Sequence, residues 1–171
     1  VWKCRVIVQG FKEDKLYLDG PDYVYAANVC ELTAVRRLLF EPRADPNGSD
    51  AGEDPVILAF VDVSTAFLQA DMFGPDDPPR YLKVFDPVTG KWRYFRQLGN
   101  LYGSSSAGKR WEKTLVSWLV SDEVGFVQGS NEPCAFFHKA REIRLLTYCD
   151  DLFIRARRSE AEAACEGSTR A

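Results

Sequence analysis

The chain has 171 residues, of which 46% are hydrophobic and 13% aromatic, so it can bury a core and is not expected to be disordered. Its net charge of −3 argues weakly against a nucleic-acid-binding protein, and its five cysteines include no C-x-x-C pair, which favours reduced thiols over a zinc or redox site. No segment resembles a signal peptide or a membrane span, so we expect an intracellular protein, in a cytoplasmic particle or the nucleus, without a membrane partner.

The first part of the chain predicts a strand, a helix and a loop. Residues 3–9 predict a strand that ends at Gly10. Asn28 and Glu31 have the spacing of a capping box for a helix. Its apolar face would carry Leu32, Val35, Leu38 and Leu39, and Pro42 would end it. Residues 41–55 hold five acids and several Gly and Pro residues, which indicates a loop.

The middle of the chain predicts a buried strand, a hairpin and a helix. Residues 56–61 are continuously apolar, as expected of a strand buried on both faces, and a short helix is predicted over 64–70. Residues 81–85 and 91–97 predict a hairpin. After a turn at 103–106, a helix is predicted whose apolar stripe is Trp111, Leu115, Trp118 and Leu119.

The last part predicts strands over 136–138, 144–149 and 152–156, and a helix from Ser159. Asp150 and Asp151 lie between the last two strands. Because strands and helices do not alternate regularly, we expect an α+β fold rather than a doubly wound one.

Basic and aromatic residues are concentrated in residues 80–113, which hold eight bases against two acids. Among these bases stand Tyr81, Trp92, Tyr94 and Phe95. Such a surface can contact phosphates and stack on bases. The alternative is a solvated hairpin whose aromatic side chains pack inward.

Three aspartates stand at the ends of apolar strands: Asp62, Asp150 and Asp151. A carboxylate at such a place is costly unless it is paired or binds a cation. Three of them at neighbouring strand ends would suit two divalent cations, which can assist an in-line displacement at phosphorus. The alternative is that Asp150–Asp151 is only a turn and that Asp62 caps a helix.

Five segments, in order, resemble the reverse transcriptase of copia-type LTR retrotransposons. Residues 60–69 (FVDVSTAFLQ) are similar to its first catalytic motif, and 148–151 (YCDD) to its Tyr-x-Asp-Asp box. The segment Leu101-Tyr102-Gly103, with Arg110-Trp111 after it, is similar to the family's Leu-Tyr-Gly…Arg-x-Trp segment. Gly125-Phe126 with residues 132–138, and residues 3–12, resemble two further family segments.

The resemblance implies a right-hand polymerase palm with partial fingers and an antiparallel sheet packed by helices. It implies RNA-directed DNA polymerase activity, with two Mg²⁺ ions (or Mn²⁺) held by Asp62, Asp150 and Asp151. The partners would be a primed RNA or DNA template, a dNTP and the rest of a polyprotein. The residues expected at the nucleotide are Lys3, Arg5, Phe67, Tyr102 and Gly103. Those expected at the template and primer are Tyr148, Lys109 and Arg110.

The implied nucleotide-site residues have ordinary alternatives. Phe67, the expected steric gate against a ribose 2′-OH, could instead pack in the core, and Tyr102 could be a buried aromatic residue. Lys3 and Arg5 could lie on the solvated face of an edge strand.

The resemblance divides the chain into mainly fingers (1–55), mainly palm with a fingers insertion (56–158) and a tail (159–171). Residues 104–108 (SSSAG) depart from the family's Leu-Lys-Gln-Ser-Pro, which loses one base and one proline at the expected template surface. Thumb and ribonuclease H segments are lacking, so we expect a fragment. A degraded, non-catalytic remnant that at most binds nucleic acid is the alternative function.

Overall fold

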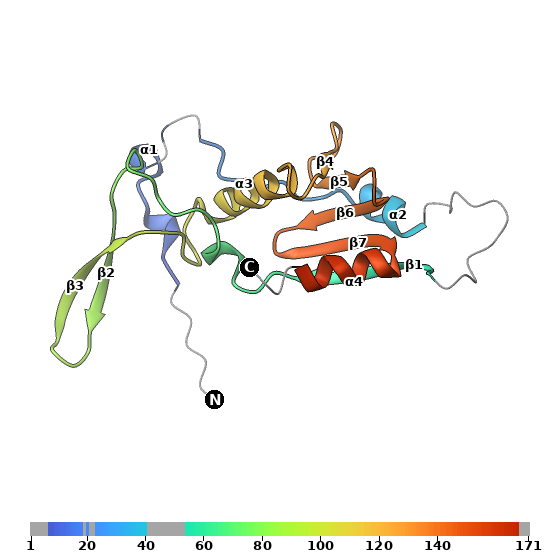
Figure 1. The fold of residues 1–171 in the computed structure, drawn as a ribbon. Helices are drawn as coiled ribbons and strands as arrows, with labels where there is room; N and C mark the ends of the chain where they lie inside the picture. The colour runs from blue at the N-terminus through green and yellow to red at the C-terminus, as the bar shows by residue number, and fades with distance from the viewer. Residues whose placement is uncertain (1–6, 19, 21–22, 41–53, 168–171) are drawn as a thin grey trace. The chain divides into compact units, whose positions relative to one another are not determined.

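The computed structural model describes residues 7–18, 20, 23–40 and 54–167 and shows an α+β fold (Figure 1). The chain forms two compact units, each built from two segments. The first unit comprises residues 1–27 and 65–115, and the second comprises 28–64 and 116–171. Each unit is described by itself below.

The second unit is built on a five-stranded antiparallel sheet with the order β1-β7-β6-β5-β4. Its strands are β1 (Val56–Asp62), β4 (Val127–Gln128), β5 (Ala135–His138), β6 (Ile143–Tyr148) and β7 (Asp151–Arg157). Helix α4 (Arg158–Gly167) follows β7 directly and packs along β7 and β1, whereas α2 (Leu32–Phe40) packs on β6.

One face of this sheet is buried, and the other is open at β1 but buried at Leu146 of β6, the strand that packs against α2. In β7, Leu152, Ile154 and Ala156 are buried, and the residues that alternate with them are not. In β1, Leu58 and Phe60 are 42% and 66% exposed. The alternation of side chains along β1 and β7 therefore gives this part of the sheet one apolar core face and one accessible face.

The first unit contains a two-stranded antiparallel hairpin and most of a helix. The hairpin pairs β2 (Arg80–Asp86) with β3 (Lys91–Gln97) and stands out from the rest of its unit (Figure 1). Short helices η1 (Gly10–Lys12), α1 (Lys15–Leu18) and η2 (Ala66–Leu68) also belong to it. Helix α3 (Ala107–Leu119) buries Ala107, Trp111 and Leu115 and continues into the second unit, where Leu119 is buried.

Most of the predicted elements are confirmed, but three expectations about burial are wrong. The strand over 56–61 is not buried on both faces, because β1 lies at the edge of the sheet and one of its faces is open. Trp118 is 51% exposed, Leu32 is 63% exposed and Leu39 is 36% exposed, so none of them completes its helical stripe. The predicted strand over 3–9 and the acidic loop over 41–55 fall mostly outside the described residues, and residues 7–9 are not in a strand.

None of the helices in the described part of the chain combines the length and the apolar character that crossing a membrane requires.

Candidate metal and nucleotide site

Two of the three aspartates, Asp62 and Asp151, lie opposite each other on two paired strands. Asp62 ends β1 and Asp151 begins β7, and the antiparallel register makes them direct partners. Opposite residues of an antiparallel pair have Cα atoms about 4.5–5.5 Å apart and side chains on the same face. Both side chains are exposed. The fold therefore brings together two carboxylates that are 89 positions apart in the sequence.

The third aspartate lies in the tight turn between β6 and β7. Tyr148 pairs with Asp151, so Cys149 and Asp150 form a two-residue loop. Cys149 has a φ of 54°, and the N–H of Val63 donates to the carbonyl of Asp150 at 2.9 Å. This hydrogen bond ties the turn to the segment that follows Asp62. Tyr148 stands in the same row as Asp151 and is 44% exposed.

The donor set fits a hard divalent cation in its chemistry and in its backbone placement. Three exposed carboxylates can supply the oxygen ligands that Mg²⁺ and Mn²⁺ prefer. Across the described ranges, however, no three Asp, Glu, His or Cys side chains are gathered as ligands around one point. Binding by these aspartates would therefore require their exposed side chains to turn toward a common ion.

The thiol of Cys149 shares the environment of the two following carboxylates. Partial burial raises its pKa, and the negative charges of Asp150 and Asp151 raise it further. Both effects favour the neutral thiol over the thiolate. The turn thus concentrates negative charge without adding a third anion beside the carboxylates.

Phe67, Tyr102 and Gly103 come together within the first unit. The rings of Phe67 and Tyr102 have centroids 5.8 Å apart, and both residues are partly exposed. The carbonyls of Tyr102 and Gly103 accept hydrogen bonds from the N–H groups of Val8 and Gly10, at 2.7 and 3.0 Å. Gly103 has a φ of 86°, and a Cβ there would lie 2.2 Å from the carbonyl oxygen of Val8. Position 103 therefore requires glycine because the backbone of Val8 leaves no room for a Cβ, not because a nucleotide approaches it.

The two bases expected at the template are engaged in ion pairs of the first unit. Lys109 Nζ lies 2.7 Å from Glu112 Oε2, and Arg110 pairs with Asp77. The guanidinium carbons of Arg110 and Arg80 lie 4.6 and 4.7 Å from the centroid of Phe73. Arg110 thus serves an internal cluster that the sequence analysis did not anticipate, since no local spacing joins Asp77 to it. Lys3 and Arg5 lie outside the described residues.

One face of the β2–β3 hairpin carries a ladder of aromatic and basic side chains with no acid. The register pairs Tyr81 with Arg96, Lys83 with Tyr94, and Phe85 with Trp92. The four rings are 48–67% exposed, and Lys83 Nζ lies 4.6 Å from the centroid of Trp92. The alternative of inward-packed aromatics is wrong for this face, which we call the hairpin ladder.

No family model, curated protein or solved structure matches the chain.

Proposed function

We propose that the chain is the fingers-and-palm part of a copia-type reverse transcriptase, which adds a dNTP to a primer 3′-OH under the direction of a template. The observation that carries the proposal is the pairing of Asp62 with Asp151, beside a turn that holds Asp150. In the family that this chain resembles, the first catalytic motif and the Tyr-x-Asp-Asp box supply the metal-binding acids. The pairing of β1 with β7 would therefore bring the acids of these two segments together, as a two-metal site in a palm requires.

In this proposal Asp62, Asp150 and Asp151 hold two Mg²⁺ ions. When bound, such ions lower the pKa of the attacking hydroxyl and neutralise charge on the leaving phosphate. The protein's own part is to position the acids on a rigid sheet, where β1, β7 and β6 hold neighbouring strand ends. Phe67, Tyr102, Gly103, Lys3 and Arg5 keep the nucleotide roles that the resemblance implies, and Tyr148 keeps its role at the template and primer. Lys109 and Arg110 would take that role only by leaving their ion pairs with Glu112 and Asp77.

The hairpin ladder supports the nucleic-acid part of this proposal. Its basic side chains can attract phosphates, and its exposed rings can stack on bases. Neither interaction depends on the base sequence of the nucleic acid. The same observation favours a second candidate function, in which the chain binds nucleic acid and performs no chemistry.

Two measurements on one set of proteins separate the candidates. We expect the 171-residue chain to extend a primer on an RNA template with Mn²⁺ at low salt. Asp151→Asn should reduce the rate of extension by about 10²-fold or more, while the Kd for primer–template stays within about twofold of the wild-type value. Asp122→Asn, an exposed acid of the same unit, is the charge-matched control and should leave both unchanged.

Mn²⁺-induced broadening of NMR signals gives a readout that does not require turnover. In the presence of primer–template and dNTP it should centre on residues 62 and 150–151 and disappear in Asp151→Asn. Binding that weakens steeply with salt, without extension and without this broadening, would leave the second candidate as the function.

A further inference from the structure

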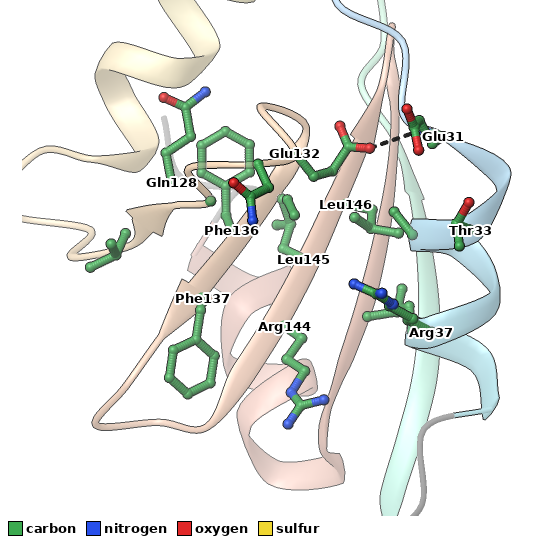
Figure 2. A pocket seen from close by; sticks show the side chains of 16 residues that line it. Glu31, Thr33, Arg37, Gln128, Glu132, Phe136, Phe137, Arg144, Leu145 and Leu146 are labelled. Carbon is green, nitrogen blue, oxygen red and sulfur yellow. Dashed lines mark hydrogen bonds between the residues drawn. The ribbon is translucent and has the colours of Figure 1, made fainter.

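A hollow of about 590 Å³ lies in the second unit, between α2 and the strands β4, β5 and β6 (Figure 2). This volume is within the range of small-molecule sites in proteins. The proposed polymerase chemistry makes no use of it, since Asp62, Asp150 and Asp151 are absent from its lining.

The floor of the hollow is apolar and well packed. Leu38 comes from α2, Phe136 from β5, and Leu145 and Leu146 from β6, and each is at most 6% exposed. Phe137 also lines the hollow, and its ring is 40% exposed. An apolar or aromatic ligand body would gain burial against these side chains.

Two acidic side chains line the hollow near the N-terminal end of α2: Glu31 directly precedes the helix, and Glu132 lies in the loop between β4 and β5. The Glu132 carboxylate accepts a hydrogen bond from the N–H of Glu31 at 3.0 Å (Figure 2). It also accepts one from the N–H of Cys134 at 3.1 Å. It thereby satisfies backbone donors beside the start of the helix. At this end of the hollow, the Glu132 carboxylate therefore already binds backbone N–H groups of the protein.

Two arginines stand further along the hollow, one on each wall. Arg37 lies on α2, six residues after Glu31, which directly precedes the helix, and Arg144 lies near the start of β6 (Figure 2). Both are exposed, and within the described residues Arg37 makes no ion pair or hydrogen bond. A guanidinium is well suited to bind a carboxylate through two parallel N–H donors.

The charge of the lining selects among anions. Arg37 and Arg144 are balanced by Glu31 and Glu132, so the lining as a whole is neutral and only its far end is basic. Because the lining as a whole is neutral, it offers no excess of positive charge to a dianion such as phosphate, and its apolar floor favours an anion that carries an apolar body. We propose that this hollow binds a monocarboxylate with an apolar or aromatic body, the carboxylate on Arg37 and the body on Phe137 and Leu146, which lie on the same face of the sheet. The proposal does not rest on the polymerase function.

The test uses naphthalene-2-carboxylate and its uncharged partner, naphthalene-2-carboxamide, added to the full chain and followed by two-dimensional amide NMR. We expect the carboxylate to bind one site with a Kd of about 1 mM or below, shifting signals of α2, β5 and β6. The carboxamide should bind about tenfold more weakly, because it cannot form the charge-assisted pair.

Neighbouring arginines of α2 supply a matched pair of variants. Arg37→Gln should weaken carboxylate binding about tenfold and leave carboxamide binding unchanged, whereas Arg36→Gln, whose side chain does not line the hollow, should change neither beyond about twofold. Both variants remove one charge from an exposed helix position, so both should fold.

A third variant tests the hollow itself. Ala34→Phe would place a ring in the hollow from α2 and should abolish binding of both probes, with folding of the second unit verified by unchanged signals of β1 and β7, which do not line the hollow. Equal weakening by Arg36→Gln and Arg37→Gln, equal affinity for the two probes, or shifts that do not saturate by about 10 mM would each overturn the proposal.

Discussion

The two units of this chain are stabilised in different ways. The second unit has a five-stranded sheet whose buried face carries apolar side chains such as Leu145, Ile154 and Ala156. The first unit has a two-stranded hairpin whose aromatic ladder is exposed. It is held instead by the buried stripe of α3, close backbone contacts at Gly10 and Gly103, and the cluster of Asp77, Arg110, Arg80 and Phe73.

This difference shows how a small region without a broad sheet can still be ordered. Apolar burial in the second unit does not depend on the ionisation of a side chain, whereas the ion pair between Asp77 and Arg110 in the first unit depends on the ionisation of its carboxyl. The same difference leaves the hairpin's rings available to a partner. Substitutions at matched positions in the two units can break or sharpen the comparison.

The largest effect is expected at the close backbone contact of the first unit. Gly103→Ala should lower the free energy of unfolding by about 4 kcal/mol, because the added Cβ meets the Val8 carbonyl at 2.2 Å and φ is 86°. Gly90→Ala shares a positive φ, 65°, but has open space around its Cβ, and should cost about 1 kcal/mol. Denaturant melts measure both, and equal losses would show that the backbone contact contributes nothing.

The next effect concerns the two faces of the sheet in the second unit. Leu145→Ala should cost about 3 kcal/mol, because the side chain is 4% exposed and leaves a cavity. The same substitution at Leu58, on the open face and 42% exposed, should cost about 1 kcal/mol or less. Amide hydrogen exchange of β6 and β7 reports the loss locally, and comparable costs at the two sites would contradict the one-sided core.

A smaller, pH-dependent effect is expected in the arginine cluster. Partial burial raises the pKa of Asp77, but hydrogen bonds from Arg110 and the N–H of Gly74, with the charges of Arg110 and Arg80, outweigh it and lower that pKa below its ordinary value. A lowered folded-state pKa stabilises the fold above the unfolded pKa, and this contribution is lost as pH falls through the folded pKa.

Asp77→Asn should therefore cost about 1–2 kcal/mol at pH 7, and the difference from wild type should shrink below about pH 4. Asp76→Asn, at the adjacent exposed carboxyl, is the control and should be neutral at both pH values. Urea melts across this pH range supply the measurement, and a pH-independent cost at Asp77 would argue against the ion pair.

The smallest effect concerns the turn beside the aspartates. Cys149 adopts a φ of 54°, which a residue with a Cβ rarely takes. Cys149→Gly should raise stability by about 0.5 kcal/mol, the relief of that strain less the entropy cost of glycine. Cys149→Ala keeps the Cβ and should show no gain. A stability loss in Cys149→Gly would mean that the thiol's packing outweighs the backbone strain.

Local sequence patterns determined most elements of this protein. The hairpin at 80–97, helix α3, strands β5–β7 and the C-terminal helix follow from periodicity and turn residues, because these signals act within a few residues. The placement of Asp62 and Asp150–Asp151 at strand ends is likewise visible in the sequence.

The tertiary structure alone decided which strands pair and which faces are covered. An apolar run such as 56–61 is the same in a central strand and in an edge strand, so only the strand order shows that Phe60 is exposed and that Asp62 pairs with Asp151. The pairing of Arg110 with Asp77 and the hollow beside Arg37 also depend on residues distant in the chain. Local propensity carries no information about such contacts, because their free energy arises only once the elements have packed.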